Sequence, residues 1–311
     1  AIPHSSMRLL MRCIRCALFM GREISVRCPV RIDLAGGWSD VPAYCNIKSG
    51  EVVNVAINHY VTAKKVIDKN RKMTVQYTTE TPIGSGLGTS GAMNVALLAA
   101  IAGEGKELGE IAELAFQFES LLGNTGGRQD QWASAFGGIN HLTFRGDGVE
   151  IKQLNPSIQF CTWLQTHLLL FDTNIQHLSG QIHDNIWQQF HNQDKQVIQG
   201  LDLIRDAGLA MASAIDDEDS SQVVNSIRMV MLGIDLIDKK LHDPFRETLN
   251  PLEETGSVLA WKAMGAGGGG IVGVLVKDSE HAKSSLIQAT ELAGWEHLQW
   301  EIEYTGIDQL S

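Results

Sequence analysis

The sequence lacks the features of a membrane, secreted or nucleic-acid-binding protein. Its apolar run at 16–20 is too short to cross a bilayer, and the cleavable pattern of a secretory signal is missing. Lysine and arginine total 25 against 36 acidic residues, which gives a net charge of −11. That balance disfavours a general nucleic-acid or anionic-membrane surface, so any anion site must be local. We expect neither nucleic acid nor a membrane as a partner.

Cysteine is scarce as well, and its five copies cannot all pair. Cys28, Cys45 and Cys161 lie in apolar or strand-like surroundings, where a reduced thiol packs as a small hydrophobe. This usage fits a reducing cytoplasm. Cys13 and Cys16 form a lone CxxC without the second ligand pair of a structural zinc site. Residues 1–22 are arginine-rich and acid-poor before Glu23, and we interpret them as an N-terminal segment or linker rather than a targeting sequence.

With 311 residues, of which 44% are hydrophobic, the chain can bury a large core and suggests about two domains. Apolar periodicity predicts an α+β first half and a helix-rich second half closed by further strands. The expected strands are 26–33, 51–66 with a bend at 58–60, 73–79, a hairpin over 137–154 turning at 146–148, 165–171, a glycine loop and strand over 261–276, and 295–303. The expected helices are 91–102, 108–122, 177–193, 197–214, 220–241 and 279–294.

The stretch 81–91, Thr-Pro-Ile-Gly-Ser-Gly-Leu-Gly-Thr-Ser-Gly, has the composition of a phosphate cradle. Alternate glycines let backbone N–H groups converge without interference from Cβ atoms, and a helix opening near Ser90 would present its unpaired amides to an anion. The cradle residues are Pro82, Gly84, Ser85, Gly86, Leu87, Gly88, Thr89, Ser90 and Gly91.

Two familiar nucleotide motifs fit this stretch poorly. Gly86-x-Gly88-x-x-Gly91 satisfies a dinucleotide fingerprint, but that site needs a second strand ending in an acid about 20 residues later, where 106–122 reads as a helix. No lysine follows the glycines where a P-loop requires one. A nicotinamide dehydrogenase therefore stays a less favoured alternative.

Two further segments accompany the cradle: 27–40, which runs from a strand into the turn Ala-Gly-Gly-Trp-Ser-Asp, and 262–270, which ends in a glycine run. In this order the three segments resemble motifs one, two and three of the GHMP small-molecule kinases, over roughly residues 26 to 304. The turn at 35–40 and the strand at 167–173 are similar to fucokinases, whereas 126–138 is more similar to heptose-phosphate kinases.

The resemblance implies an α+β, two-lobed fold, with an N-terminal lobe like domain 2 of ribosomal protein S5 and a ferredoxin-like C-terminal lobe. It places the lobes at 23–160 and 161–311, with the active site between them. It implies ATP and Mg²⁺ as cofactors and a small sugar or sugar phosphate as partner, in a cytoplasmic monomer or homodimer. Only about fifteen residues separate the strand ending near Val66 from the cradle, fewer than this family usually has around adenine.

The resemblance also assigns roles to individual residues. Asp130 matches the catalytic base, and Arg31 matches a motif-one cation that supports it electrostatically. Ser90 and Glu119 match Mg²⁺ ligands, with Thr89 as a substitute for Ser90. The expected substrate contacts are Trp38, Ser39, Asp40, Gly127, Arg128, Gly267 and Gly268.

These motifs predict a kinase that phosphorylates a sugar hydroxyl, with the anomeric O1 of a fucose-like sugar or a heptose 7-phosphate as acceptor. Arg128, beside the catalytic Asp130, is the residue that could bind a phosphate on the acceptor through both of its terminal nitrogens. The alternatives are another GHMP kinase, similar to galactokinase or mevalonate kinase, and a nucleotide-sensing protein without turnover.

Overall fold

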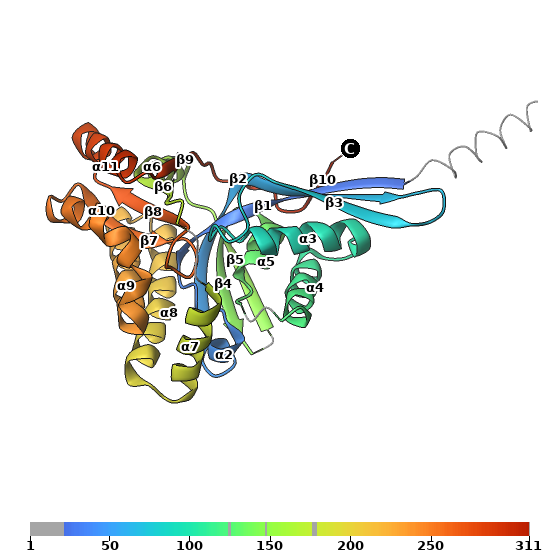
Figure 1. Cartoon of the computed structure of the whole chain (residues 1–311), viewed down its shortest axis with the longest axis horizontal. Coiled ribbons are helices and arrows are strands. Elements are labelled where there is room, and N and C mark those ends of the chain that lie inside the picture. The colour runs from blue at the N-terminus through green and yellow to red at the C-terminus, as the bar shows by residue number, and fades with distance from the viewer. Residues whose placement is uncertain (1–21, 124–125, 147, 176–178, 311) are drawn as a thin grey trace, which may run out of the picture.

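The structure is a computed structural model that describes residues 22–123, 126–146, 148–175 and 179–310. The segment 1–21 and its CxxC lie outside the described residues, as does position 147 in the predicted hairpin turn. Two antiparallel sheets carry the fold, each with helices against it (Figure 1). No helix in the described part of the chain is long and apolar enough to cross a membrane.

The first sheet has the strand order β10-β1-β2-β4-β5, and β3 pairs with the far half of β2. Its strands are β1 (Arg22–Ala35), β2 (Gly50–Ile67), β3 (Met73–Thr79), β4 (Ile139–Arg145), β5 (Gly148–Leu154) and β10 (Asp308–Leu310). The bend predicted at 58–60 is confirmed, because the β1–β2 register shifts between Pro29 and Val30, opposite Tyr60 and Ile57. Such a bulge bends the strand and increases its twist.

Helices cover both faces of this sheet. One face packs on α3 and α5, with α4 against these two helices, and the other face packs on the long helix α8 (Figure 1). The bounds in this half are α2 (Pro42–Cys45), α3 (Thr89–Ala102), α4 (Leu108–Leu121) and α5 (Gln129–Phe136). Val95 and Ala96 of α3 are fully buried, as expected for a helix that is apolar nearly all round.

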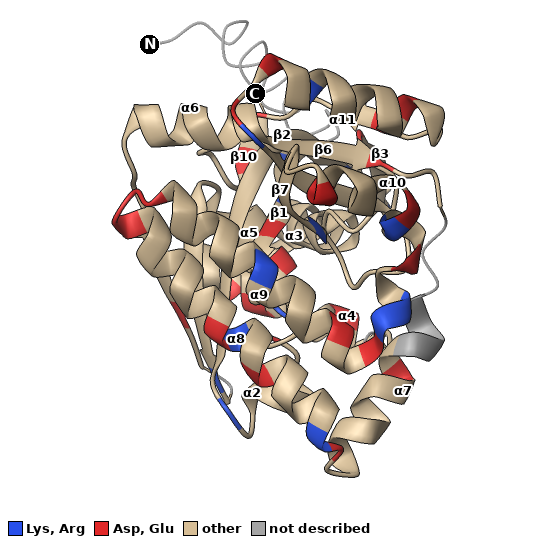
Figure 2. Ribbon diagram, turned by 90° about the vertical axis from the view of Figure 1, so that its left-hand side faces the viewer, with Lys and Arg blue, Asp and Glu red and all other residues tan. Residues whose placement is uncertain are grey.

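The second sheet has the order β7-β8-β6-β9. Its strands are β6 (Leu168–Asp172), β7 (Val258–Ala263), β8 (Ile271–Val276) and β9 (Glu296–Leu298). The helices of this half are α6 (Ile158–His167), α7 (Ser179–His191), α8 (Lys195–Asp216), α9 (Ser220–Asp238), the 3₁₀ turn η1 (Lys239–Leu241), α10 (Asp243–Glu254) and α11 (Glu280–Leu292). Figure 2 shows α8 and α9 side by side on one face of the molecule, with acidic and basic residues interspersed along them.

Several sequence predictions differ from the structure. Helices α5, α6 and α10 were not predicted, and residues 165–167 belong to α6 rather than to a strand. The predicted closing strand over 295–303 shortens to β9, with one further bridge between Ile57 and Ile302. The lobe boundary at 160 and 161 stays a prediction: it falls inside α6, and β10 returns to pair with β1 of the first sheet.

Candidate active site

The phosphate cradle joins β3 to α3, and its glycines adopt backbone conformations that other residues rarely adopt. Gly84, Gly86 and Gly88 have φ values of 84°, 90° and 73°, and Gly88 is the N-cap of α3. No side chain caps that helix end. The first backbone amides of α3 therefore remain available to an anion, together with the positive end of the helix dipole.

The glycine run at 265–270, in the second half of the chain, packs against this cradle. The Ile271 amide donates to the Ser85 carbonyl at 2.8 Å, and a Cβ on Gly86 would lie 2.9 Å from the Gly265 nitrogen. Gly267 and Gly268 pack against Leu241 of η1, to which the Gly268 amide donates. These two predicted substrate contacts thus support the loop, whereas Met264, Gly265 and Ala266 line the pocket.

Arg31, on β1, joins all three motifs through one guanidinium group. Its Nε and Nη2 donate to Asp130 Oδ1 at 2.8 and 2.6 Å, and its Nη1 donates to the carbonyls of Gly86 and Met264 at 2.5 and 3.0 Å. The backbone amide of Arg31 also donates to the Leu87 carbonyl. Because the residue is 5% exposed, water screens these charge-assisted bonds weakly.

Asp130 stands in the first turn of α5, directly against the start of α3. Cβ atoms on Gly88 and Gly91 would lie 3.0 Å from its Cγ and 2.5 Å from its Cβ. The glycines of the cradle therefore serve two purposes: they expose amides to phosphate, and they let the carboxylate approach the same place. The structure brings the predicted base and the predicted phosphate site together.

Asp40 lies at the other end of the pocket and is completely buried. The Gln129 amide donates to its Oδ2 at 3.0 Å, and a Cβ on Gly127 would lie 1.8 Å from the same oxygen. Burial raises the pKa of this carboxyl to about 6; the Gln129 hydrogen bond lowers the pKa, and the negative charges of Asp130 and Asp33 raise it. An ionised Asp40 is thus costly to the folded state.

Five further side chains complete this end. Trp38 has a φ of 89°, which is strained for a bulky residue, and its ring stacks on His183 of α7 with 4.4 Å between centroids. Asp33 pairs with Lys262. The Lys262 Nζ lies 3.0 Å from the Oδ2 of Asp33 and donates to the backbone carbonyl oxygen of Asp33 at 2.6 Å. Asp184, next to His183, also lines the pocket.

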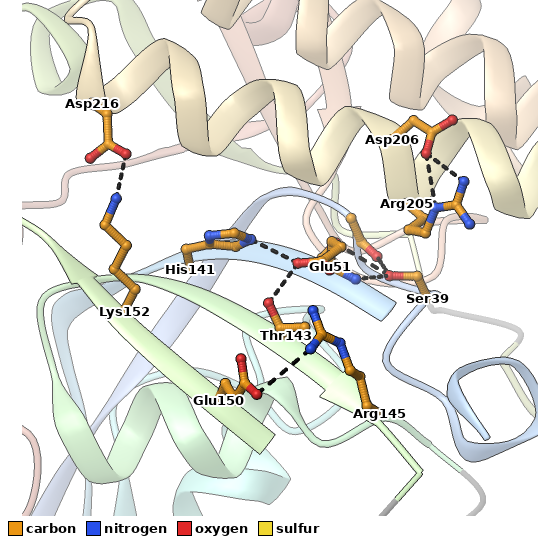
Figure 3. Close-up of polar contacts among 11 residues, drawn as sticks. Ser39, Glu51, His141, Thr143, Arg145, Glu150, Lys152, Arg205, Asp206 and Asp216 are labelled. Carbon is orange, nitrogen blue, oxygen red and sulfur yellow. Dashed lines mark hydrogen bonds and ion pairs between the residues drawn. The ribbon is translucent and has the colours of Figure 1, made fainter. Parts of the chain in front are cut away.

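Two predicted substrate contacts point elsewhere. Ser39 is fully buried, and its Oγ bonds the backbone of Gly36 and Glu51, so it fixes the turn instead of facing a substrate. Figure 3 shows Ser39 beside Glu51, whose carboxylate accepts bonds from His141 and Thr143 at 2.9 and 2.7 Å.

Arg128 is the second. Its guanidinium stacks over the Phe116 ring, 4.6 Å from the centroid, and donates to the Gly146 carbonyl at 3.3 Å. It is not among the side chains that line the pocket. The prediction that it faces the acceptor is therefore not supported by its position.

The predicted Mg²⁺ ligands flank the start of α3. Ser90 lines the pocket, and Glu119 of α4 is buried, with its two oxygens accepting bonds from Asn94 and Gln131 at 2.6 and 2.9 Å. Asn94 also donates to the Ser90 carbonyl. Thr89 Oγ1 instead lies 2.8 Å from Thr81 Oγ1, which favours Ser90 as the hydroxyl ligand. A hydroxyl and a carboxylate are donors of the hard type that Mg²⁺ accepts.

These elements enclose one pocket of about 460 Å³ between the cradle and the turn at 36–41. Sequence reasoning missed Asp33, Gln129, Lys262, His183 and Asp184. The spacing of Asp33 from Arg31 places both on one face of β1 and could have indicated it. Nothing local in the sequence marks α7 as part of the site.

The raised pKa of Asp40 predicts how stability depends on pH. Because the folded state binds this proton more tightly than the unfolded chain, the free energy of unfolding falls as pH rises from about 4 toward 6. Asp40→Asn should remove the penalty and stabilise the protein at pH 7.5 by up to about 3 kcal/mol, with little effect at pH 4. Urea unfolding at both pH values measures this, with the exposed Asp217→Asn as control. Equal or lower stability of Asp40→Asn at pH 7.5 would contradict it.

Comparisons with known proteins agree with this geometry. Residues 52–138 match the GHMP kinases N terminal domain. A D-glycero-alpha-D-manno-heptose 7-phosphate kinase of Campylobacter jejuni is 24% identical over 319 residues, which cover 86% of this chain and 93% of that protein. A bifunctional fucokinase/GDP-fucose pyrophosphorylase of Arabidopsis thaliana is also 24% identical, and its alignment covers 92% of this chain. The chain spans only 32% of that protein's length.

A solved structure supports the fold. The crystal structure of a D-glycero-D-manno-heptose 1-phosphate kinase from Bacteriodes thetaiotaomicron superposes with a TM-score of 0.72 at 21% identity, over 93% of this chain and 99% of that one. The α+β, two-lobed arrangement predicted from the sequence is confirmed. Residues 52–138 thus carry the N-terminal domain of the GHMP kinases, and the chain shares the fold of these kinases, in agreement with the resemblance of its three glycine motifs.

Proposed function

We propose that this chain is an ATP-dependent sugar kinase that transfers the γ-phosphoryl group to a sugar hydroxyl, the anomeric O1 of a fucose-like sugar or of a heptose 7-phosphate. One observation carries the proposal: the buried Arg31 and the partly exposed Asp130 form an ion pair directly against the glycine cradle at the start of α3. Phosphoryl transfer needs little beyond an electrostatic cradle and a positioned nucleophile, and this pair lies where the two would meet.

In the proposed mechanism, the amides at the start of α3 bind the phosphates of ATP. The Asp130 carboxylate accepts a hydrogen bond from the acceptor hydroxyl and orients it. Asp130 Oδ1 is bound by Arg31, which fixes the orientation of the carboxylate, and Oδ2 lies toward Gly88. Because the transition state is loose, orienting the hydroxyl contributes more than removing its proton early. Ser90 and Glu119 would hold Mg²⁺, which neutralises phosphate charge when bound.

An assay of ADP release with ATP, Mg²⁺ and a panel of sugars tests the proposal against its alternatives. Release that requires a sugar supports a sugar kinase, and phosphorus NMR of the product identifies the hydroxyl that is phosphorylated. Release only with a non-sugar alcohol points to another GHMP kinase. Tight ATP binding without release favours a nucleotide sensor, and a melting temperature raised by NAD but not by ATP favours a dehydrogenase.

Replacing Asp130 tests the base. Asp130→Asn keeps the shape of the side chain and a bond from Arg31, but it removes the negative charge, so turnover should fall by about 10² to 10⁴. Affinity for ATP should change little, because the phosphates contact the cradle. Steady-state kinetics and nucleotide titration measure both, with Lys152→Ala on the distant β5 as control. Turnover equal to that of the parent would refute the assignment.

The cradle contains a matched pair of glycines. Gly84 and Gly86 both have positive φ, but a Cβ on Gly84 meets nothing within 4 Å, whereas one on Gly86 collides with Gly265. Alanine costs about 1 kcal/mol at either position because of the backbone conformation. The collision adds to this only at Gly86, so Gly86→Ala should raise the KM for ATP clearly more than Gly84→Ala does. Equal KM values in the two variants would show that the contact with the third motif is unimportant.

The proposed metal ligands predict a change in Mg²⁺ dependence. Ser90→Ala and Glu119→Gln each remove or weaken a hard oxygen ligand, so both should raise the Mg²⁺ concentration at half-maximal rate while the KM for the sugar stays similar. Gln117→Ala, exposed on the same helix as Glu119, is the control. Normal Mg²⁺ titrations for both variants would reject these ligands.

A further inference from the structure

Three polar atoms at the end of the pocket away from the cradle have no hydrogen-bond partner among the described residues. They are Asp33 Oδ1, Gln129 Oε1 and Trp38 Nε1. Their residues line the pocket and are only 5%, 7% and 7% exposed. Buried polar groups are almost always hydrogen-bonded in folded proteins, and each that is not costs free energy. Three together beside one pocket point to a ligand that completes them.

The chemistry of these atoms defines what that ligand offers. A carboxylate oxygen and an amide oxygen accept hydrogen bonds, and an indole N–H donates one. Hydroxyl groups can serve all three, since each donates one hydrogen bond and accepts others. A polyhydroxylated ring is therefore matched, whereas a phosphate group could only accept and would leave both oxygens unsatisfied.

Charge at this end of the pocket argues in the same direction. Four carboxylates, those of Asp33, Asp40, Asp130 and Asp184, line the pocket. Among the described lining residues of this pocket, Arg31 is the sole lysine or arginine, and its guanidinium is bonded to Asp130, Gly86 and Met264.

The nearby cations do not change this balance. Lys262 lies in a smaller adjoining cavity, paired with Asp33. Arg128, which would suit a sugar phosphate, is held over Phe116 instead. A dianionic phosphate in this end would meet carboxylates at low dielectric, where like charges repel strongly.

We propose that the acceptor is an uncharged sugar whose hydroxyls bind Asp33, Gln129 and Trp38, and not a sugar phosphate. The inference rests on the proposed sugar kinase function and decides between its two acceptors. In this proposal Asp33 and Gln129 accept hydrogen bonds from the sugar hydroxyls and so determine which sugar binds, and the indole N–H of Trp38 donates one to the sugar. The strained backbone of Trp38 and its stacking on His183 keep that donor fixed at the pocket.

The sharpest test compares two acceptors that differ only in a phosphate. The ADP-release assay is run with D-glycero-D-manno-heptose and with its 7-phosphate, and L-fucose is added as a second neutral sugar. We expect kcat/KM for at least one neutral sugar to exceed that for the 7-phosphate by about tenfold or more, since one lost or repulsive contact with a buried charge has this size. Preference for the 7-phosphate would overturn the inference but leave a sugar kinase. No ADP release with any of the three would contradict the sugar kinase itself.

Two variants test whether Gln129 and Asp33 bind the sugar or only stabilise the fold. Gln129→Leu should lower kcat/KM for the neutral sugar by about tenfold, mainly through KM, with the KM for ATP unchanged. Asp33→Asn keeps the shape and a bond from Lys262 but removes a negative charge, so it should narrow the discrimination between heptose and its 7-phosphate. A structural role alone would not change that ratio. Full acceptor affinity in a folded Gln129→Leu, or selective loss of the 7-phosphate reaction in Arg128→Ala, would overturn the inference.

Discussion

The site depends on one guanidinium group. Arg31 reaches a carboxylate 99 residues away and a carbonyl 233 residues away, and it also binds the cradle at Gly86. No local interaction could hold these segments together, because each belongs to a different strand, loop or helix start. Arginine suits this position because its planar fork places donors in fixed directions, which the single ammonium group of lysine cannot do. The cradle, the proposed base Asp130 and the third motif are thus held together by one buried residue.

Several features of this site lower the stability of the folded state, and contacts elsewhere in the fold compensate for them. Asp40 is buried with a raised pKa, Trp38 holds a strained φ, and polar atoms of the acceptor end lack partners. The turn at 36–41, which carries Trp38 and Asp40, is held in place by the first sheet. Ser39 forms hydrogen bonds with the backbone of Glu51, and Thr143 of β4 donates to the Glu51 carboxylate. Helix α8 packs so closely over this point that a Cβ on Gly208 would lie 2.1 Å from the Glu51 carbonyl. Binding groups can stay unsatisfied because their support is rigid.

The features that depend on short stretches of sequence were predicted correctly. Glycine spacing identified the positive-φ cradle, and apolar patterns identified β2, β3 and α3 within a few residues. Helix α10 was not predicted, and it contains Pro244 and Pro251. The first proline fits the opening turn, and Phe245 and Leu249 are buried in the core of the second sheet. Arg128 was assigned to the acceptor because it neighbours Asp130 in the sequence. At the N-cap of α5, two residues before Asp130, its side chain takes a different direction and reaches Phe116.

The remainder of the site arises from contacts between distant segments, which no window of sequence contains. His183 and Asp184 belong to a polar, amphipathic helix that reads as an ordinary surface element, and only its packing on Trp38 makes it part of the pocket. The two ends of the pocket consequently obey different constraints. The cradle end consists of backbone amides and closely packed glycines, where a Cβ on Gly86, Gly88 or Gly91 would collide with Gly265 or Asp130. The other end consists of side chains from β1 and the turn that follows it, from the start of α5 and from α7. A fold built this way can keep one way of holding a nucleotide phosphate while the side chains at the other end of the pocket vary, and this is why the proposed choice of acceptor rests on those few side chains.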